Sequence, residues 1–145
     1  MPDAKVYRRE IHSRLAEVDW LCTDMRALLA SSDLDEARFA IELLAHESLC
    51  NAVIHGNKKN ADKRVLLEIR VGRVWVRLQV TDEGNGFDWR KKSFLPGDVG
   101  DTTGRGIALY ALYAERRQFN AFGNQVTLWI RKRKLEGERN GLIRC

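Results

Sequence analysis

Cysteine is scarce in this chain of 145 residues, and its scarcity excludes two kinds of stabilising site. Cys22, Cys50 and Cys145 are odd in number and have no paired spacing, so they predict neither a disulfide framework nor a zinc site. Long apolar runs are missing as well. No segment reaches the length of a membrane span, and residues 1–12 lack the apolar stretch of a signal peptide. We therefore expect a cytoplasmic protein without membrane contact.

Proline is also rare, with two residues, and no linker or internal repeat interrupts the chain. A chain of this length is the size of one domain and can bury most of its apolar surface in one core. We predict a single domain over residues 1–145, with a core at about 6–133 and a charged C-terminal tail at 134–145.

Positive charge is in mild excess, with a formal net charge of +5. Basic runs at residues 58–59, 90–92 and 131–134 are compatible with nucleic-acid binding. However, solvated basic edges are more common, and no aromatic residues alternate with base-reading side chains here. We therefore expect no direct contact with nucleic acid. An anionic ligand remains compatible with the charge.

Helical periodicity is strongest in the first third of the chain. Apolar residues recur at helical spacing over 13–30, and capping residues at 31–33 separate this helix from a second one at about 35–54. A third helix is predicted at 107–117, directly after a glycine-rich stretch.

The other segments alternate between apolar and polar residues, as strands do. We predict an edge strand at 6–11, a hairpin of 65–71 and 74–80 around Gly72-Arg73, and a closing hairpin around Gly123-Asn124. One face of the strands is apolar, which fits antiparallel pairing with helices on one side. The fold class is thus a single-domain, two-layer α/β sandwich with a mixed, mostly antiparallel sheet and helices on one face.

A polar stripe runs along the second helix. Glu47, Asn51 and His55 stand four residues apart, which confines them to a stripe roughly 80° wide. Their neighbours are mostly apolar, and a carboxylate on such a helix is costly unless it has a partner or faces a cleft. From the helix alone, a satisfied buried network explains Glu47 and Asn51 as well as a functional site does. His55, near the helix end, is interpreted as structural.

Glycines cluster at two further places. Asp82 ends a strand and is followed by Gly84 and Gly86, where a ligand could approach the backbone closely. Gly104 and Gly106 precede the third helix, whose N-terminus would favour an anion. Taken singly, the first is also ordinary turn chemistry and the second a flexible loop.

The three stretches together resemble a known family. HESLCNAVIHG (46–56), DEGNGF (82–87) and GRGIAL (104–109) look like the N-box and the two glycine boxes of the GHKL, or histidine-kinase-like, ATPase superfamily. The short chain and the AVIHG ending resemble its anti-sigma factor serine/threonine kinases. The resemblance covers about residues 6–133 and implies the Bergerat-type ATP-binding fold, with ATP and Mg²⁺ as cofactors.

It also implies residue roles. Glu47 would be the catalytic base that accepts the proton of a serine hydroxyl, and Asn51 would hold Mg²⁺ at the phosphates. Asp82 would meet the adenine amino group, with Gly84 and Gly86 allowing close approach. Phosphoryl transfer needs positioning and charge neutralisation more than covalent help, so such a set is chemically sufficient.

The resemblance implies that the second glycine box, GRGIAL (104–109), binds phosphate. Residues 88–103 would form a lid over the nucleotide, and Gly104, Arg105 and Gly106 would line the phosphates. Ile107 stands where leucine is more usual, a conservative change. The lid sequence matches no pattern of the family, which leaves Arg105 the least supported site residue.

Partners follow from the resemblance alone. It implies a protein serine kinase that phosphorylates a STAS-type antagonist and sequesters a sigma factor, acting as a homodimer. The alternative is a nucleotide-gated protein-binding module without significant kinase activity.

Overall fold

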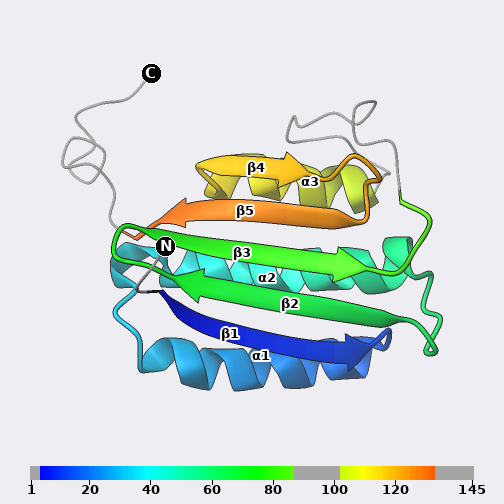
Figure 1. The fold of residues 1–145 in the computed structure, drawn as a ribbon, viewed down its shortest axis with the longest axis horizontal. Helices are drawn as coiled ribbons and strands as arrows, with labels where there is room; N and C mark the ends of the chain where they lie inside the picture. The colour runs from blue at the N-terminus through cyan, green and yellow to red at the C-terminus, as the bar shows by residue number, and fades with distance from the viewer. Residues whose placement is uncertain (1–3, 87–101, 133–145) are drawn as a thin grey trace.

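The computed structural model describes residues 4–86 and 102–132, which form a five-stranded sheet covered by helices (Figure 1). The strands lie side by side in the order β1-β2-β3-β5-β4, and all four pairings are antiparallel. The described sheet is therefore antiparallel throughout, in agreement with the predicted mixed, mostly antiparallel sheet in its main feature. The strands are β1 (Lys5–His12), β2 (Arg64–Val71), β3 (Trp75–Asp82), β4 (Arg116–Phe119) and β5 (Gln125–Arg131).

The strand alternation places one apolar face toward the helices. In β2 and β3 the buried apolar side chains alternate with residues that face the other side of the sheet, among which Glu68 is also buried. The hairpin turn lies one residue later than predicted. The Gly72 N–H donates to the Trp75 carbonyl at 2.9 Å, so the two turn residues are Arg73 and Val74. Val74, predicted in the strand, is half exposed at 50%.

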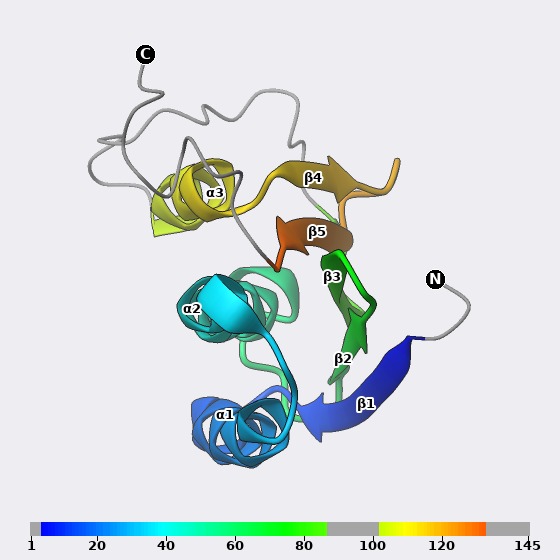
Figure 2. The same ribbon diagram turned by 90° about the vertical axis from the view of Figure 1, so that its left-hand side faces the viewer.

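All helices cover the same face of the sheet, as Figure 2 shows. They are α1 (Leu15–Ala30), the 3₁₀ turn η1 (Asp35–Ala37), α2 (Arg38–Asn51), the π turn η2 (Ala52–Gly56) and α3 (Thr102–Tyr113). α2 lies between α1 and α3 and is the central helix of the layer. The two-layer α/β architecture is thus confirmed.

α3 departs from its predicted position by several residues at each end. It begins at Thr102 and ends at Tyr113, whereas the pattern predicted 107–117. Arg116 and Arg117 belong to β4 and pair with Trp129 and Leu128 of β5. Charged residues with good helix propensity favoured a longer helix, but pairing with β5 prevails over that weak preference.

The core lies between the sheet and the helices. Its fully buried large side chains come from β1, α1, α2, β2, β3 and β5: Ile11, Leu21, Met25, Leu29, Ile41, Leu44, Leu49, Leu67, Ile69, Leu78 and Leu128. Cys22 is buried in this core, and Cys50 is half-buried against it. Over the described ranges, the helices are too short or too polar to cross a membrane.

Candidate functional site

The end of α2 forms the first wall of the site. Glu47 and Asn51 lie one turn apart on α2, and both are half-buried. The helix then widens, because the Asn57 N–H donates to the Ala52 carbonyl, five residues back, at 2.8 Å. Single π turns of this kind occur often at functional sites. This one carries an exposed His55 and brings the chain to the end of β3.

Asp82, the last residue of β3, forms the second wall. Its Oδ1 accepts a hydrogen bond from the Gly84 N–H at 2.8 Å. Burial raises the pKa of the Asp82 carboxyl, and the Gly84 N–H and the charge of Lys63 offset part of that rise. Asn124 fixes the backbone of Asp82, since the Asn124 side-chain amide donates to the Asp82 carbonyl at 2.9 Å. A carboxylate in this setting is a partly desolvated, oriented acceptor.

Three glycines allow the chain to close around Asp82. A Cβ on Gly56 would lie 2.8 Å from Asp82 Oδ1, and one on Gly84 would collide with the Gly56 carbonyl. Gly86 adopts φ +78°, and a Cβ there would collide with the Phe122 carbonyl. Only glycine permits such approach of backbone to carboxylate and of backbone to backbone.

A cavity of about 130 Å³ opens between these walls. Its floor is apolar and comes from the helix-covered face of the sheet, through Val80, Phe119 and Val126. Polar groups stand at its margin. The lining residues are Ser48, Asn51, Ala52, His55, Gly56, Val80, Asp82, Gly86, Tyr110, Phe119, Gly123, Asn124, Gln125 and Val126. Apolar walls with a few fixed polar groups are typical of small-ligand sites.

Tyr110 connects the cavity to α3. The Asn51 side-chain amide donates to the Tyr110 hydroxyl at 3.0 Å, and Tyr110 is only 2% exposed. Burial raises the pKa of this hydroxyl, with a smaller opposing effect of the Asn51 hydrogen bond, so Tyr110 stays neutral at physiological pH. The bond uses the amide nitrogen of Asn51. Among the described residues, Asn51 Oδ1 receives no hydrogen bond, which leaves this oxygen as an acceptor beside the cavity.

The predicted residues divide into three groups. Asn51, Asp82 and Gly86 line the cavity, and Gly84 is buried against Gly56 next to it. Glu47 is on the same helix one turn away but is not among the lining residues, and it has no hydrogen bond or ion pair within the described ranges.

The start of the second glycine box (104–109) lies inside α3, whereas the sequence predicted a loop before the helix. Gly104, Arg105 and Gly106 fall inside the first turns of α3 rather than before its start, so they do not form a loop that leads into a helix N-terminus. The Arg105 side chain and residues 88–101 of the predicted lid lie outside the described part of the structure. Residues 102 and 103 of that predicted lid belong to α3.

Sequence reasoning missed Gly56, Tyr110 and Asn124 as site residues. Gly56 ended the N-box stretch but was given no role at the site, and Tyr110 was visible only as one apolar position in a helix. Asn124 was visible as a turn residue. The side chain of Asn120 orders that turn by accepting from the N–H groups of Gly123, Asn124 and Gln125 at 2.8, 3.0 and 3.2 Å. No local spacing in the sequence connects these residues with Asp82.

Comparison with known proteins agrees with the geometry. A search of curated proteins finds no match. A family model described as the histidine kinase-like ATPase domain matches residues 11–130, which is most of the chain and includes every residue that lines the cavity. With the two-layer fold and the cavity at Asp82, this match shows that the chain belongs to the histidine kinase-like ATPase domain family, whose members use ATP.

Proposed function

We propose that this chain is an ATP-dependent protein serine kinase. It phosphorylates a STAS-type anti-sigma factor antagonist and sequesters a sigma factor. The observation that carries the proposal is the pairing of an oriented, half-buried carboxylate at Asp82 with an apolar cavity whose opposite wall bears Asn51. Family membership supports ATP as the nucleotide. The residues around the cavity support the roles that follow.

The cavity suits an adenine ring. Val80, Phe119 and Val126 present apolar surface to a flat aromatic base, and Asp82 accepts a hydrogen bond from its amino group. Such a site discriminates strongly, because a base without that amino group would leave a desolvated carboxylate without a donor. We therefore expect adenine nucleotides to bind better than guanine nucleotides.

Asn51 suits a hard cation. Mg²⁺ prefers oxygen ligands and takes few of them from protein when phosphates and waters supply the rest. Asn51 Oδ1 meets this requirement, since among the described residues the hydrogen bond of this side chain, to Tyr110, uses the amide nitrogen. A metal held there with the nucleotide would supply charge neutralisation at the phosphates.

Glu47 is the proposed base. The serine oxygen forms the new bond to the γ-phosphorus while the bond to ADP breaks, and the hydroxyl proton passes to the Glu47 carboxylate. Its position one turn before Asn51, beside but outside the lining of the cavity, supports a role next to the phosphates rather than next to the adenine. Its lack of a charged partner among the described residues leaves the carboxylate available to take a proton.

For the homodimer, α1 is the proposed contact surface. It leaves Trp20 exposed at 61%, and Leu15 and Leu28 are exposed on the same helix. A dimer contact on α1 would remove these apolar side chains from water, which favours association.

The test follows labelled γ-phosphate from Mg²⁺-ATP to the proteins of the native cell extract. Wild type and Glu47→Gln are compared, with Glu42→Gln as the matched control, because Glu42 is on the same helix but is paired with Arg38 at 3.2 Å. One small protein labelled on serine, lost with Glu47→Gln and kept with Glu42→Gln, supports the kinase. Nucleotide binding without any labelled protein contradicts it and favours a nucleotide-gated binding module.

A further inference from the structure

No described element covers the sheet face opposite the helices; we call it the open face. Figure 1 looks onto it, and Figure 2 shows it from the side. Alternation along the strands places six arginines but only two glutamates there. Its charged residues are Arg8, Glu10, Arg64, Glu68, Arg70, Arg77, Arg116 and Arg131.

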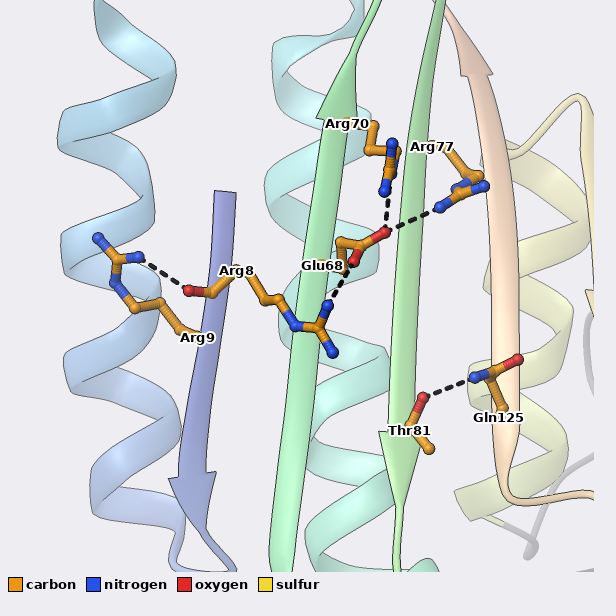
Figure 3. Close-up of polar contacts among 7 residues, drawn as sticks. All are labelled: Arg8, Arg9, Glu68, Arg70, Arg77, Thr81 and Gln125. Atoms are coloured by element: carbon orange, nitrogen blue, oxygen red, sulfur yellow. Dashed lines mark hydrogen bonds and ion pairs between the residues drawn. The ribbon is translucent and has the colours of Figure 1, made fainter. Parts of the chain in front are cut away.

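Glu68 is the centre of this charge arrangement (Figure 3). Its Oε1 accepts from Arg70 Nε at 2.9 Å and from Arg77 Nη2 at 2.8 Å, and its Oε2 lies 3.5 Å from Arg8 Nη1. The Arg70 hydrogen bond lowers the pKa of Glu68, although burial opposes this. One carboxylate cannot neutralise three guanidinium groups, so positive charge remains in excess around it.

Two further arginines are held by tryptophan rings. The Arg131 guanidinium lies 4.6 Å from the Trp75 ring centroid, and that of Arg116 lies 5.0 Å from the Trp129 centroid. Stacking on an indole leaves the N–H groups of a guanidinium free to donate to an acceptor. These cations are therefore positioned in advance.

A polar hollow of about 260 Å³ lies between these groups. It is lined by Arg77, Gln79, Gln118, Asn120, Gln125, Thr127 and Trp129. Two of its amides are oriented by hydrogen bonds across strands, from Gln79 to Thr127 at 3.0 Å and from Gln125 to Thr81 at 2.9 Å (the latter in Figure 3). Arg77 Nε is buried and has no acceptor within the described part of the chain. A carboxylate entering the hollow would give Arg77 an additional acceptor.

We propose that the open face binds an acidic segment of a protein partner, with one carboxylate side chain in the hollow and others on Arg116 and Arg131. The argument is charge complementarity together with preorganised donors. The face lies on the opposite side of the sheet from the nucleotide cavity, so this inference stands apart from the proposed kinase activity.

Other occupants fit less well. Base stacking by a nucleic acid would need the tryptophan faces that Arg116 and Arg131 occupy. A second copy in isologous contact would bring its own six arginines against these six. An acidic polypeptide meets neither obstacle.

The test measures binding of a fluorescent twelve-residue glutamate peptide by anisotropy at several salt concentrations. A glycine-serine peptide, a single-stranded oligonucleotide and an anionic lipid vesicle are measured beside it. The variant is Arg116→Glu with Arg131→Glu. Its matched control is Arg14→Glu with Lys58→Glu, which makes the same charge change at exposed residues off this face. Circular dichroism and ADP binding check that both proteins fold.

We expect the glutamate peptide to bind at least tenfold more weakly to the Arg116/Arg131 variant, and within twofold of wild type to the control. Equal weakening in both proteins would overturn the proposal, because diffuse net charge would then explain binding. Tighter, face-dependent binding of the oligonucleotide or the vesicle would overturn it as well. So would self-association that the Arg116/Arg131 variant abolishes.

Discussion

Removal of one hydroxyl group tests how Asn51 is positioned. Tyr110→Phe keeps the buried ring but deletes the acceptor that lies 3.0 Å from the Asn51 amide nitrogen. A half-buried amide then lacks a partner, which costs about 1–2 kcal/mol of stability. The amide also gains freedom to rotate, so Asn51 Oδ1 no longer faces the cavity in one orientation. The variant should therefore lose affinity for a ligand only where binding of that ligand uses Asn51 Oδ1.

Under the proposed function, the binding that uses this oxygen is metal-dependent nucleotide binding. We expect ADP affinity without Mg²⁺ to stay within about twofold of wild type, and the gain in affinity on adding Mg²⁺ to fall about tenfold, which corresponds to about 1.4 kcal/mol. Isothermal titration calorimetry with and without Mg²⁺ measures both quantities. A purely structural role would weaken binding equally in the two conditions.

A double-mutant cycle makes the test stricter. If Tyr110 acts through Asn51, adding Tyr110→Phe to Asn51→Ala should change the Mg²⁺ effect no further. Additive losses in the double variant would refute the reasoning. An unchanged Mg²⁺ effect in Tyr110→Phe alone would refute it as well.

Three more changes test the site and the open face. Gly56→Ala should abolish ADP binding and cost about 1–3 kcal/mol by urea denaturation, because its Cβ would meet the Asp82 carboxylate; near-wild-type binding would contradict the glycine argument. Asp82→Asn should weaken ADP binding about tenfold or more yet raise the melting temperature at neutral pH. Burial raises the folded-state pKa of Asp82, so the contribution of this carboxyl to stability falls as pH rises from the ordinary value of 3.8 through the folded-state pKa. The difference in melting temperature between the variant and wild type should therefore grow over that pH range. Glu68→Gln should cost about 1–3 kcal/mol by urea denaturation, since three arginines lose a charged acceptor. Because the folded-state pKa of Glu68 is lowered, its contribution to stability is fully present above the ordinary pKa of 4.5 and is lost as pH falls through the folded-state pKa. Acidification should therefore reduce the difference in free energy of unfolding between the variant and wild type.

Much of the fold could be predicted because its signals are local. Period-two alternation marked the strands and helical spacing marked α1 and α2, since each pattern shows which side chains share a face. Prediction was weaker where two local tendencies competed. Residues Glu115–Arg117 have good helix propensity, yet β4 forms there because Glu115 and Arg116 pair with Trp129 of β5.

Local patterns along the chain were sufficient to predict the two-layer class, the shared stripe of Glu47 and Asn51, and the position of Asp82 at a strand end. Only the tertiary structure decided that Gly56 meets Asp82 and that Tyr110 holds Asn51, residues separated by 26 and 59 positions respectively. Spacing along a chain sets orientation within one element. Contacts between elements depend on how α2, α3 and β3 pack, and that is a property of the whole core.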